Sequence, residues 1–182
     1  MSNLPSMGSI SDEDLIVIYD GGVIVENETI IGVGKFHEIK KHCNNIHEID
    51  FPCVLLPGFI DCHTHICYAG SRSIEYSKKN AGISYQKILS EGGGIYDTME
   101  KTRLASDEEL IKNTISRLER HFFEGVLTCE VKSGYGINFD QEIRLLKIIN
   151  EINLSHPSDV IPTCLAAHVP PNDSQTSTGE YL

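Results

Sequence analysis

Two histidines separated by a single residue form the pattern in this chain with the clearest chemical meaning. His63 and His65 follow Asp61 at the end of the run V-L-L-P-G-F-I-D-C-H-T-H, whose apolar residues predict a buried strand. Side chains two residues apart in a strand point to the same face, so we expect the two imidazoles to point the same way. Imidazole is a preferred ligand of zinc and similar divalent metals. The alternative is a chance pair on a surface loop, but an unpartnered imidazole at the end of a buried strand would be costly.

Further polar side chains follow two later runs that predict strands. The run V-L-T-C-E-V-K carries Glu130 and Lys132 and is followed closely by Tyr135, and the run V-I-P-T-C-L-A-A leads to His168. Because the carboxyl ends of parallel strands meet at the same edge of a sheet, these groups are expected to converge near the histidine pair. Such convergence is typical of a barrel active site. Any single one of them could also be an ordinary residue at the end of a strand.

The segment after the histidine pair predicts loops rather than a nucleotide site. Arg72 lies in a glycine- and serine-containing stretch that leaves the first strand, where its guanidinium could hold a carboxylate with two hydrogen bonds. The alternative for Arg72 is a solvated surface arginine. The run S-E-G-G-G-I from Ser90 to Ile95 predicts a turn and lacks the strand and helix pattern of a phosphate-binding loop.

Helical spacing predicts two helices between these strands. Residues 106–109 form a capping box, and apolar residues then recur at helical spacing up to Phe122, before Gly125 ends the helix. A second amphipathic helix follows the loop at 133–136. Its apolar face is predicted to consist of Ile143, Leu146, Ile149 and Ile152, widened by Leu145 and Ile148. Strands that alternate with helices indicate an α/β protein with a parallel sheet.

The N-terminal part has a different character. Residues 1–53 are expected to supply strands of a small β domain, with a hairpin in which Val23–Val25 and Ile30–Val33 flank the turn E-N-E-T. This segment has too few apolar residues for a core of its own, so its sheet would need strands from elsewhere. Residues 54–182 would then hold about three β/α units, fewer than the eight of a complete barrel.

Composition narrows the class of function. The 182 residues carry a formal net charge of -11, which argues against nucleic-acid binding because phosphate contacts need a basic surface. The chain shows neither a secretory leader nor an apolar run long enough to cross a membrane, so we expect a cytoplasmic protein that does not associate with membranes. The six cysteines lack C-x-x-C spacing and mostly lie in apolar runs, which predicts reduced, buried thiols.

Several motifs together identify a family. The segments P-G-F-I-D-C-H-T-H, A-G-S-R, E-G-G-G-I, E-V-K-S-G-Y-G and A-A-H-V-P-P occur in this order. In this order and at these separations, the chain resembles the imidazolonepropionase family of the amidohydrolase superfamily from about residue 23 to its end. The first motif alone indicates the superfamily, whereas E-V-K-S-G-Y-G after E-G-G-G-I is more specific. The resemblance implies the N-terminal part of a (β/α)8 TIM-barrel metallohydrolase with a small N-terminal β-sandwich segment.

The resemblance also implies a reaction and a set of site residues. The reaction is hydrolysis of the cyclic amide bond of 4-imidazolone-5-propanoate to N-formimino-L-glutamate, a step of histidine degradation. His63 and His65 would bind one divalent metal ion, zinc or iron, and His168 would be catalytic and lie near the imidazolone ring. The substrate-binding residues would be Arg72, Tyr85, Tyr135 and His168. The partner is then a small-molecule substrate, and the full-length protein could form a homodimer.

Two alternatives remain open beside this interpretation. In the family, another histidine and an aspartate that bind the metal come from later strands, so we expect this chain to be the front part of a longer enzyme. It could instead belong to another amidohydrolase, a deaminase or a cyclic amidase, in which a carboxylated Lys132 would bridge two metal ions. It could also be a binding or regulatory fragment without catalytic activity.

Overall fold

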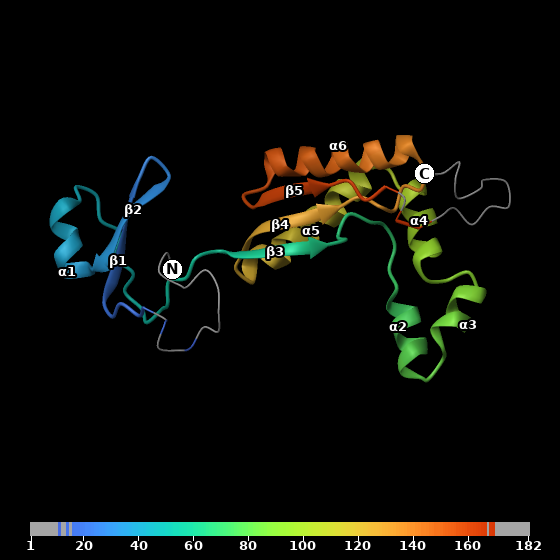
Figure 1. The fold of residues 1–182 in the computed structure, drawn as a ribbon, viewed down its shortest axis with the longest axis horizontal. Helices are drawn as coiled ribbons and strands as arrows, with labels where there is room; N and C mark the ends of the chain where they lie inside the picture. The colour runs from blue at the N-terminus through green and yellow to red at the C-terminus, as the bar shows by residue number, and fades with distance from the viewer. Residues whose placement is uncertain (1–10, 12–13, 15, 167, 170–182) are drawn as a thin grey trace. The chain divides into compact units, whose positions relative to one another are not determined.

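The chain divides into two units, Met1–Pro57 and Gly58–Leu182. The computed structural model describes residues 11, 14, 16–166, 168 and 169, so residues 170–182 of the second predicted domain lie outside the described residues. In the first unit, strands β1 (Gly21–Glu26) and β2 (Thr29–Lys35) form an antiparallel hairpin (Figure 1). A helical turn, α1 (Phe36–Ile39), and a 3₁₀ turn, η2 (Lys40–His42), follow. The hairpin predicted around E-N-E-T is therefore confirmed.

The hairpin is held by its turn and ladder rather than by a core. Asn27 and Glu28 at its tip both have positive φ angles, of 47° and 63°, which suit the tight turns that join twisted antiparallel strands. Within the described residues of the first unit no side chain is fully buried. Ile30 and Ile31 remain 63% and 58% exposed. This agrees with the expectation that the segment cannot build a core of its own.

The second unit is a layered α/β structure. Strands β3 (Phe59–Thr64), β4 (Val126–Lys132) and β5 (Asp159–Thr163) form a parallel sheet in the order β3-β4-β5. Helix α5 (Asp107–Phe123) contacts β4, and α6 (Phe139–Ser155) contacts β5 and α5 (Figure 1). The predicted α/β class with a parallel sheet and crossover helices is confirmed at this level.

Local sequence explains where the two long helices begin and end. Ser106 accepts a hydrogen bond from the backbone N–H of Glu109, as expected for the cap predicted there, and Asn138 caps α6 in the same way. Gly125 follows α5 with a φ of +90°, a left-handed conformation that glycine adopts without strain. These signals mark the ends of the two long helices, and each of them connects one strand of the sheet to its neighbour in the order β3-β4-β5.

The core lies between the sheet and the two long helices. Cys129, Val131 and Val160 on the strands are at most 1% exposed, and alternate residues of β4 point the other way. The buried apolar face of α6 consists of Leu145, Ile148, Ile149 and Ile152.

This corrects the predicted face of α6. Ile143 and Leu146 are only half-buried, whereas the two residues expected merely to widen the face are buried. The physical reason is that positions 145, 148, 149 and 152 form one helical stripe, and this is the stripe that meets β5 and α5.

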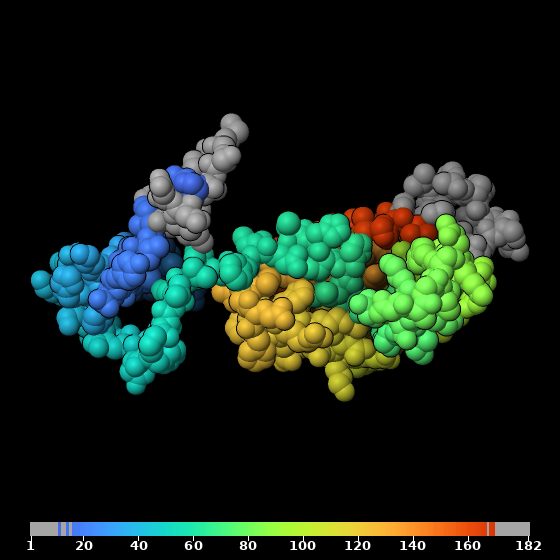
Figure 2. Space-filling model, turned by 90° about the horizontal axis from the view of Figure 1, so that it is seen from below, coloured from blue at the N-terminus to red at the C-terminus, as the bar shows by residue number. Residues whose placement is uncertain are grey.

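The strand that carries the histidine pair is shorter and more exposed than predicted. Strand β3 begins at Phe59, and the apolar run Val54–Leu56 precedes it as irregular, exposed chain. Pro57 lacks an N–H for a strand ladder, which explains why pairing starts after it. Ile60 is 71% exposed, and Figure 2 shows the β3 segment, in teal, at the surface of the second unit. The prediction of a buried strand is therefore wrong for the described structure, in which β3 pairs with β4 alone.

Three helices that the sequence reading did not predict connect β3 to α5. They are α2 (Ser73–Asn80), α3 (Tyr85–Ser90) and α4 (Ile95–Leu104). Helix α4 supplies three of the buried side chains, Thr98, Met99 and Thr102. In the described part of the chain, no helix is both long enough and apolar enough to cross a bilayer.

The cysteines follow the prediction only in part. All six are free thiols, which agrees with the prediction of reduced cysteines. Cys67 and Cys129 are buried, but Cys53, Cys62 and Cys164 are exposed. The prediction of buried thiols is wrong for these three. For Cys53 and Cys62 the reason is that the apolar residues beside them are themselves exposed.

Candidate metal and substrate site

The histidine pair lies at the carboxyl end of β3. His63 is exposed and His65, just beyond the strand, is half-buried, and their ring centroids are 5.3 Å apart. The pairing of β3 with β4 shifts register between Asp61 and Thr64, so the strand is irregular where it presents the first imidazole. The Asp61 carboxylate accepts a hydrogen bond from the backbone N–H of His63, at 3.2 Å, which fixes the local backbone.

His65 is the residue at which the strand ends meet. Its ring centroid lies 5.4 Å from that of His168, which follows β5, and 6.1 Å from that of Tyr135, which follows β4. The Tyr135 ring packs edge-on against His65 and also contacts Tyr68. The structure thus brings together four of the residues singled out in the sequence, His63, His65, Tyr135 and His168, from the ends of three adjacent strands.

Glu130, on β4, makes interactions with all three strands of the sheet. Its carboxylate accepts a hydrogen bond from the backbone N–H of Thr64 on β3, at 3.2 Å, and pairs with the Lys132 ammonium. Burial alone would raise the pKa of Glu130, but hydrogen bonds from Lys132, from the Thr163 side chain and from Thr64 outweigh it and lower the pKa. Glu130 is therefore ionised, and its carboxylate connects β3, β4 and β5 through these interactions.

The surroundings of His65 favour its neutral form. Burial lowers the pKa of His65, and the neighbouring His168, His63 and Lys132 add to the effect, while Glu130 opposes it. A neutral imidazole has a free ring nitrogen, which is the form that binds metal ions. Because several neighbouring groups are cationic or can be protonated, adding a proton to the neutral His65 imidazole would be unfavourable.

Arg117 fixes the loop that leaves the histidine pair. Its guanidinium donates hydrogen bonds to the backbone carbonyls of Ile66 and Tyr68, both at 2.7 Å, and lies 3.7 Å from the centre of the Tyr68 ring. Sequence reasoning missed this residue. An arginine in an amphipathic helix usually lies on the solvated face, so its spacing gives no signal of a buried contact.

Arg72 is positioned beside the site by α4. Its Nε donates a hydrogen bond to the Thr98 hydroxyl at 2.9 Å, and within the described residues its terminal guanidinium nitrogens make no hydrogen bond. Burial raises the pKa of Tyr135, and the positive charge of Arg72 counteracts this effect. Arg72 thus has terminal donors available for an anionic group near Tyr135.

Tyr85 lies elsewhere. It is 48% exposed on α3, and its hydroxyl would lie 3.3 Å from a Cβ at Gly94, in the triple-glycine turn. Within the described residues, Tyr85 makes no aromatic contact with the other predicted site residues.

The histidines fit a metal only in part. Two imidazoles on one side of a strand end suit the nitrogen ligands of zinc or iron. Among the described residues, no group of three or more histidine, cysteine, aspartate or glutamate side chains forms that could hold a metal ion. The described residues therefore offer two imidazoles of suitable chemistry, and a metal ion would need further ligands from other residues.

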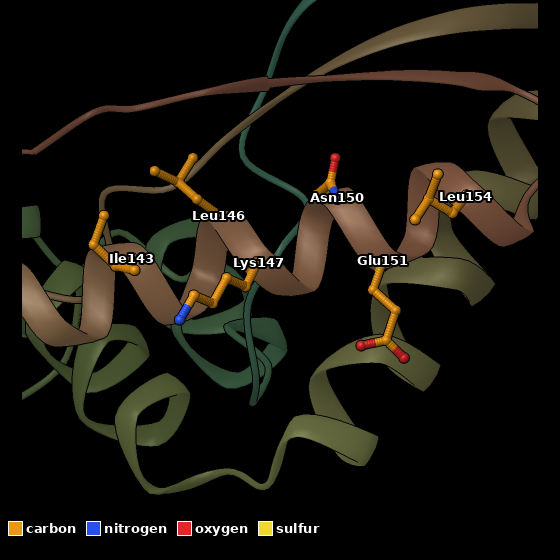
Figure 3. Close-up of a pocket in the computed structure, with 6 residues that line it drawn as sticks. All are labelled: Ile143, Leu146, Lys147, Asn150, Glu151 and Leu154. Carbon is orange, nitrogen blue, oxygen red and sulfur yellow. The ribbon is translucent and has the colours of Figure 1, made fainter.

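The groove drawn in Figure 3 lies away from these residues. This groove is lined by α6 alone, through Ile143, Leu146, Lys147, Asn150, Glu151 and Leu154. It is an open stripe along a helix and contains none of the residues at the strand ends. The chemistry of the second unit is therefore concentrated at the carboxyl edge of its sheet, not in this groove.

Comparison with known proteins gives a consistent result. The chain is 39% identical over 170 residues to an imidazolonepropionase of Chloroflexus aggregans, 37% over 166 residues to one of Acinetobacter baumannii and 37% over 174 residues to one of Geobacillus kaustophilus. These matches cover 91–93% of this chain but only 40–41% of the relatives. The chain thus spans about two fifths of the length of the curated relatives it matches. No protein-family model matches it.

Proposed function

Because this chain is a relative of the imidazolonepropionases over nine-tenths of its length, we propose that it forms the front part of such an enzyme. The reaction would be hydrolysis of the cyclic amide of 4-imidazolone-5-propanoate to N-formimino-L-glutamate. The single observation that carries the proposal is the meeting of His63, His65, Tyr135 and His168 at the ends of three parallel strands. The sheet would be the first part of a (β/α)8 barrel, and the hairpin of the first unit would belong to a small β-sandwich.

Apart from Tyr85, each residue has a role that its surroundings support. Arg72 would bind the propanoate carboxylate through its terminal donors while Thr98 holds its Nε. Tyr135, which contacts His65, would line the pocket, and His168 would lie beside the ring and act on a proton there. Tyr85 is proposed as a further pocket residue from the family resemblance alone, because its position on α3 does not support that role. When separate groups hold the carboxylate tail and the ring, the substrate is already oriented before the reaction, so less entropy is lost on reaching the transition state.

His63 and His65 would hold one zinc or iron ion. When bound, such an ion lowers the pKa of a water molecule and polarises the amide carbonyl. Since the described residues provide two ligands, the remaining ligands would come from the part of the enzyme that corresponds to the rest of the relatives' length.

The competing assignment is another amidohydrolase with two metal ions bridged by a carboxylated Lys132. Carboxylation requires a neutral amine, whereas the Lys132 ammonium is paired with the Glu130 carboxylate. This ion pair supports the assignment with one metal ion. A second metal ion per chain in elemental analysis would favour the competing assignment.

Elemental analysis and turnover of the purified chain are the first test. We expect metal bound weakly and no turnover by this chain alone, because two ligands hold a catalytic ion poorly. His65→Asn should lose the metal, whereas His47→Asn, the same change at an exposed histidine of the first unit, should not. Full, chelator-sensitive turnover by the chain alone would contradict the idea that it is only part of the site.

A chimera tests the reaction itself. The matching segment of the Chloroflexus aggregans imidazolonepropionase would be replaced by this chain, so that the relative supplies the other three fifths of its length. We expect the chimera to consume imidazolonepropionate, followed by its absorbance, and to lose activity with a chelator or with His65→Asn. A folded, metal-loaded chimera without activity would overturn the proposal.

A further inference from the structure

We propose that Glu142 is a positioning residue that holds Tyr135 against His65 by binding the backbone of the loop after β4. Glu142 lies in the first turn of α6 and is only 4% exposed. Among the described residues, its carboxylate accepts hydrogen bonds from Gly134, Gly136 and Ile137 and from none of the proposed metal or substrate residues. Its relation to the candidate site runs through the loop at 133–137.

The carboxylate of Glu142 is fully engaged by this loop. It accepts hydrogen bonds from the backbone N–H groups of Gly134 and Gly136, each at 2.7 Å, and from that of Ile137 at 3.2 Å. The first two bonds use different oxygens, so the loop wraps around both. Tyr135 is the residue between the two bonded glycines, so its backbone, from which the ring projects, is anchored to α6.

The backbone of the loop is unusual in a way that requires such a clamp. Ile137 has a φ of +70°, a left-handed conformation that a β-branched residue adopts only when its surroundings impose it. A Cβ at Gly136 would lie 2.6 Å from the backbone nitrogen of Glu142, so this close approach of loop to helix needs a glycine. The carboxylate compensates for a loop shape that local preference does not favour.

The loop also connects Tyr135 with the segment that leads to His168. The buried Ser133 donates its N–H to the carbonyl of Thr163, at 3.0 Å, and its hydroxyl accepts the N–H of Leu165, also at 3.0 Å. A shift of the loop would therefore move the chain beyond β5 as well. Glu142 thereby stabilises the relative placement of two of the proposed substrate-binding residues.

Glu142→Gln tests this role, with Ile149→Val as the matched control. The first change keeps the shape of the side chain but replaces one accepting oxygen with a donor, and the second removes a methyl group from a buried site of the same helix. We expect amide exchange at positions 134, 136 and 137 to become about tenfold faster in Glu142→Gln and to change no more than the rest of α6 in Ile149→Val. The nuclear Overhauser contacts of Tyr135 with His65 and Tyr68 should weaken only in Glu142→Gln.

Equal effects of the two variants would show a merely structural role and overturn the inference. If Glu142→Gln does not fold, the unaltered chain decides: exchange of the Gly134 and Gly136 amides at the rate of an unstructured peptide would refute the clamp, and slow exchange would support it. The structural role of Glu142 does not depend on the proposed function. Only its expected effect on the reaction rests on that function. In the chimera, Glu142→Gln should raise KM more than Ile149→Val. If every variant of the chimera is inactive but Glu142→Gln still speeds amide exchange at positions 134, 136 and 137, only the proposed function is refuted.

Discussion

The two units of this chain are ordered by different means. In the first, the hairpin has a suitable turn and a ladder that is interrupted once, between Ile24 and Val25, yet no described residue is fully buried and Ile31 remains 58% exposed. In the second, Leu118, Ile149 and Val160 are completely excluded from solvent between helices and sheet. The comparison teaches that an apolar sequence pattern alone does not give a core. Burial needs a second layer, which α5 and α6 provide only for the second unit.

The largest difference between the units should appear when a large side chain is truncated. Leu118→Ala would leave a cavity in the packed core of the second unit and lower its free energy of unfolding by about 3 kcal/mol. Ile31→Ala in the hairpin should change stability by less than about 0.5 kcal/mol, because that side chain is already mostly in water. Denaturant unfolding followed by NMR would report on each unit. Similar losses for both variants would mean that Ile31 is buried in solution.

Thiol reactivity should show a somewhat smaller contrast. Burial raises the pKa of Cys67 to about 11 from an ordinary value near 9, and this alone reduces its thiolate at pH 8 by about a hundredfold. The exposed Cys53 of the first unit should therefore be alkylated by iodoacetamide at least that much faster. Mass spectrometry of peptides over time measures both rates. Rapid labelling of Cys67 in the native chain would show that the second unit opens far more readily than its packing suggests.

The smallest effect concerns pH and should be confined to the second unit. Because burial and neighbouring charges lower the pKa of His65, the unfolded chain binds this proton more readily than the folded one. The contribution of His65 to stability is therefore complete above about pH 6.5 and is lost as pH falls through its folded pKa.

Denaturant midpoints at pH 7.5 and 5.5, in metal-free buffer, measure this contribution. The difference between the two midpoints should shrink in His65→Asn and persist in His47→Asn, which changes an exposed histidine of the first unit. An unchanged difference in His65→Asn would assign the pH dependence to other groups.

The sequence predicted the parts of the fold that depend on local patterns. The capped helix after Ser106, the hairpin and the parallel order of strands and crossover helices all follow from caps, turn residues and periodicity, which act over a few neighbours. The three short helices between β3 and α5 escaped prediction because they have few apolar positions and their packing decides their shape.

The site was predictable only at the level of its strand ends. The positions of His63, His65, Tyr135 and His168 after successive strands imply that they meet, because parallel strands share an edge. Arg117 and Glu142 could not be found in this way. Each is a charged residue in an amphipathic helix, and only the folded loops show that their partners are backbone groups.

The two outer strands of the parallel sheet have a consequence for the behaviour of this chain in solution. Within the described residues, β3 and β5 each pair with one neighbour, so each presents a row of unpaired backbone groups along its other side. Phe59, Ile60 and Ile161 lie exposed on these same strands. Open, apolar strands are templates on which further chains can add and form aggregates. Unless other residues cover these strands, the yield of soluble protein should fall steeply as its concentration rises.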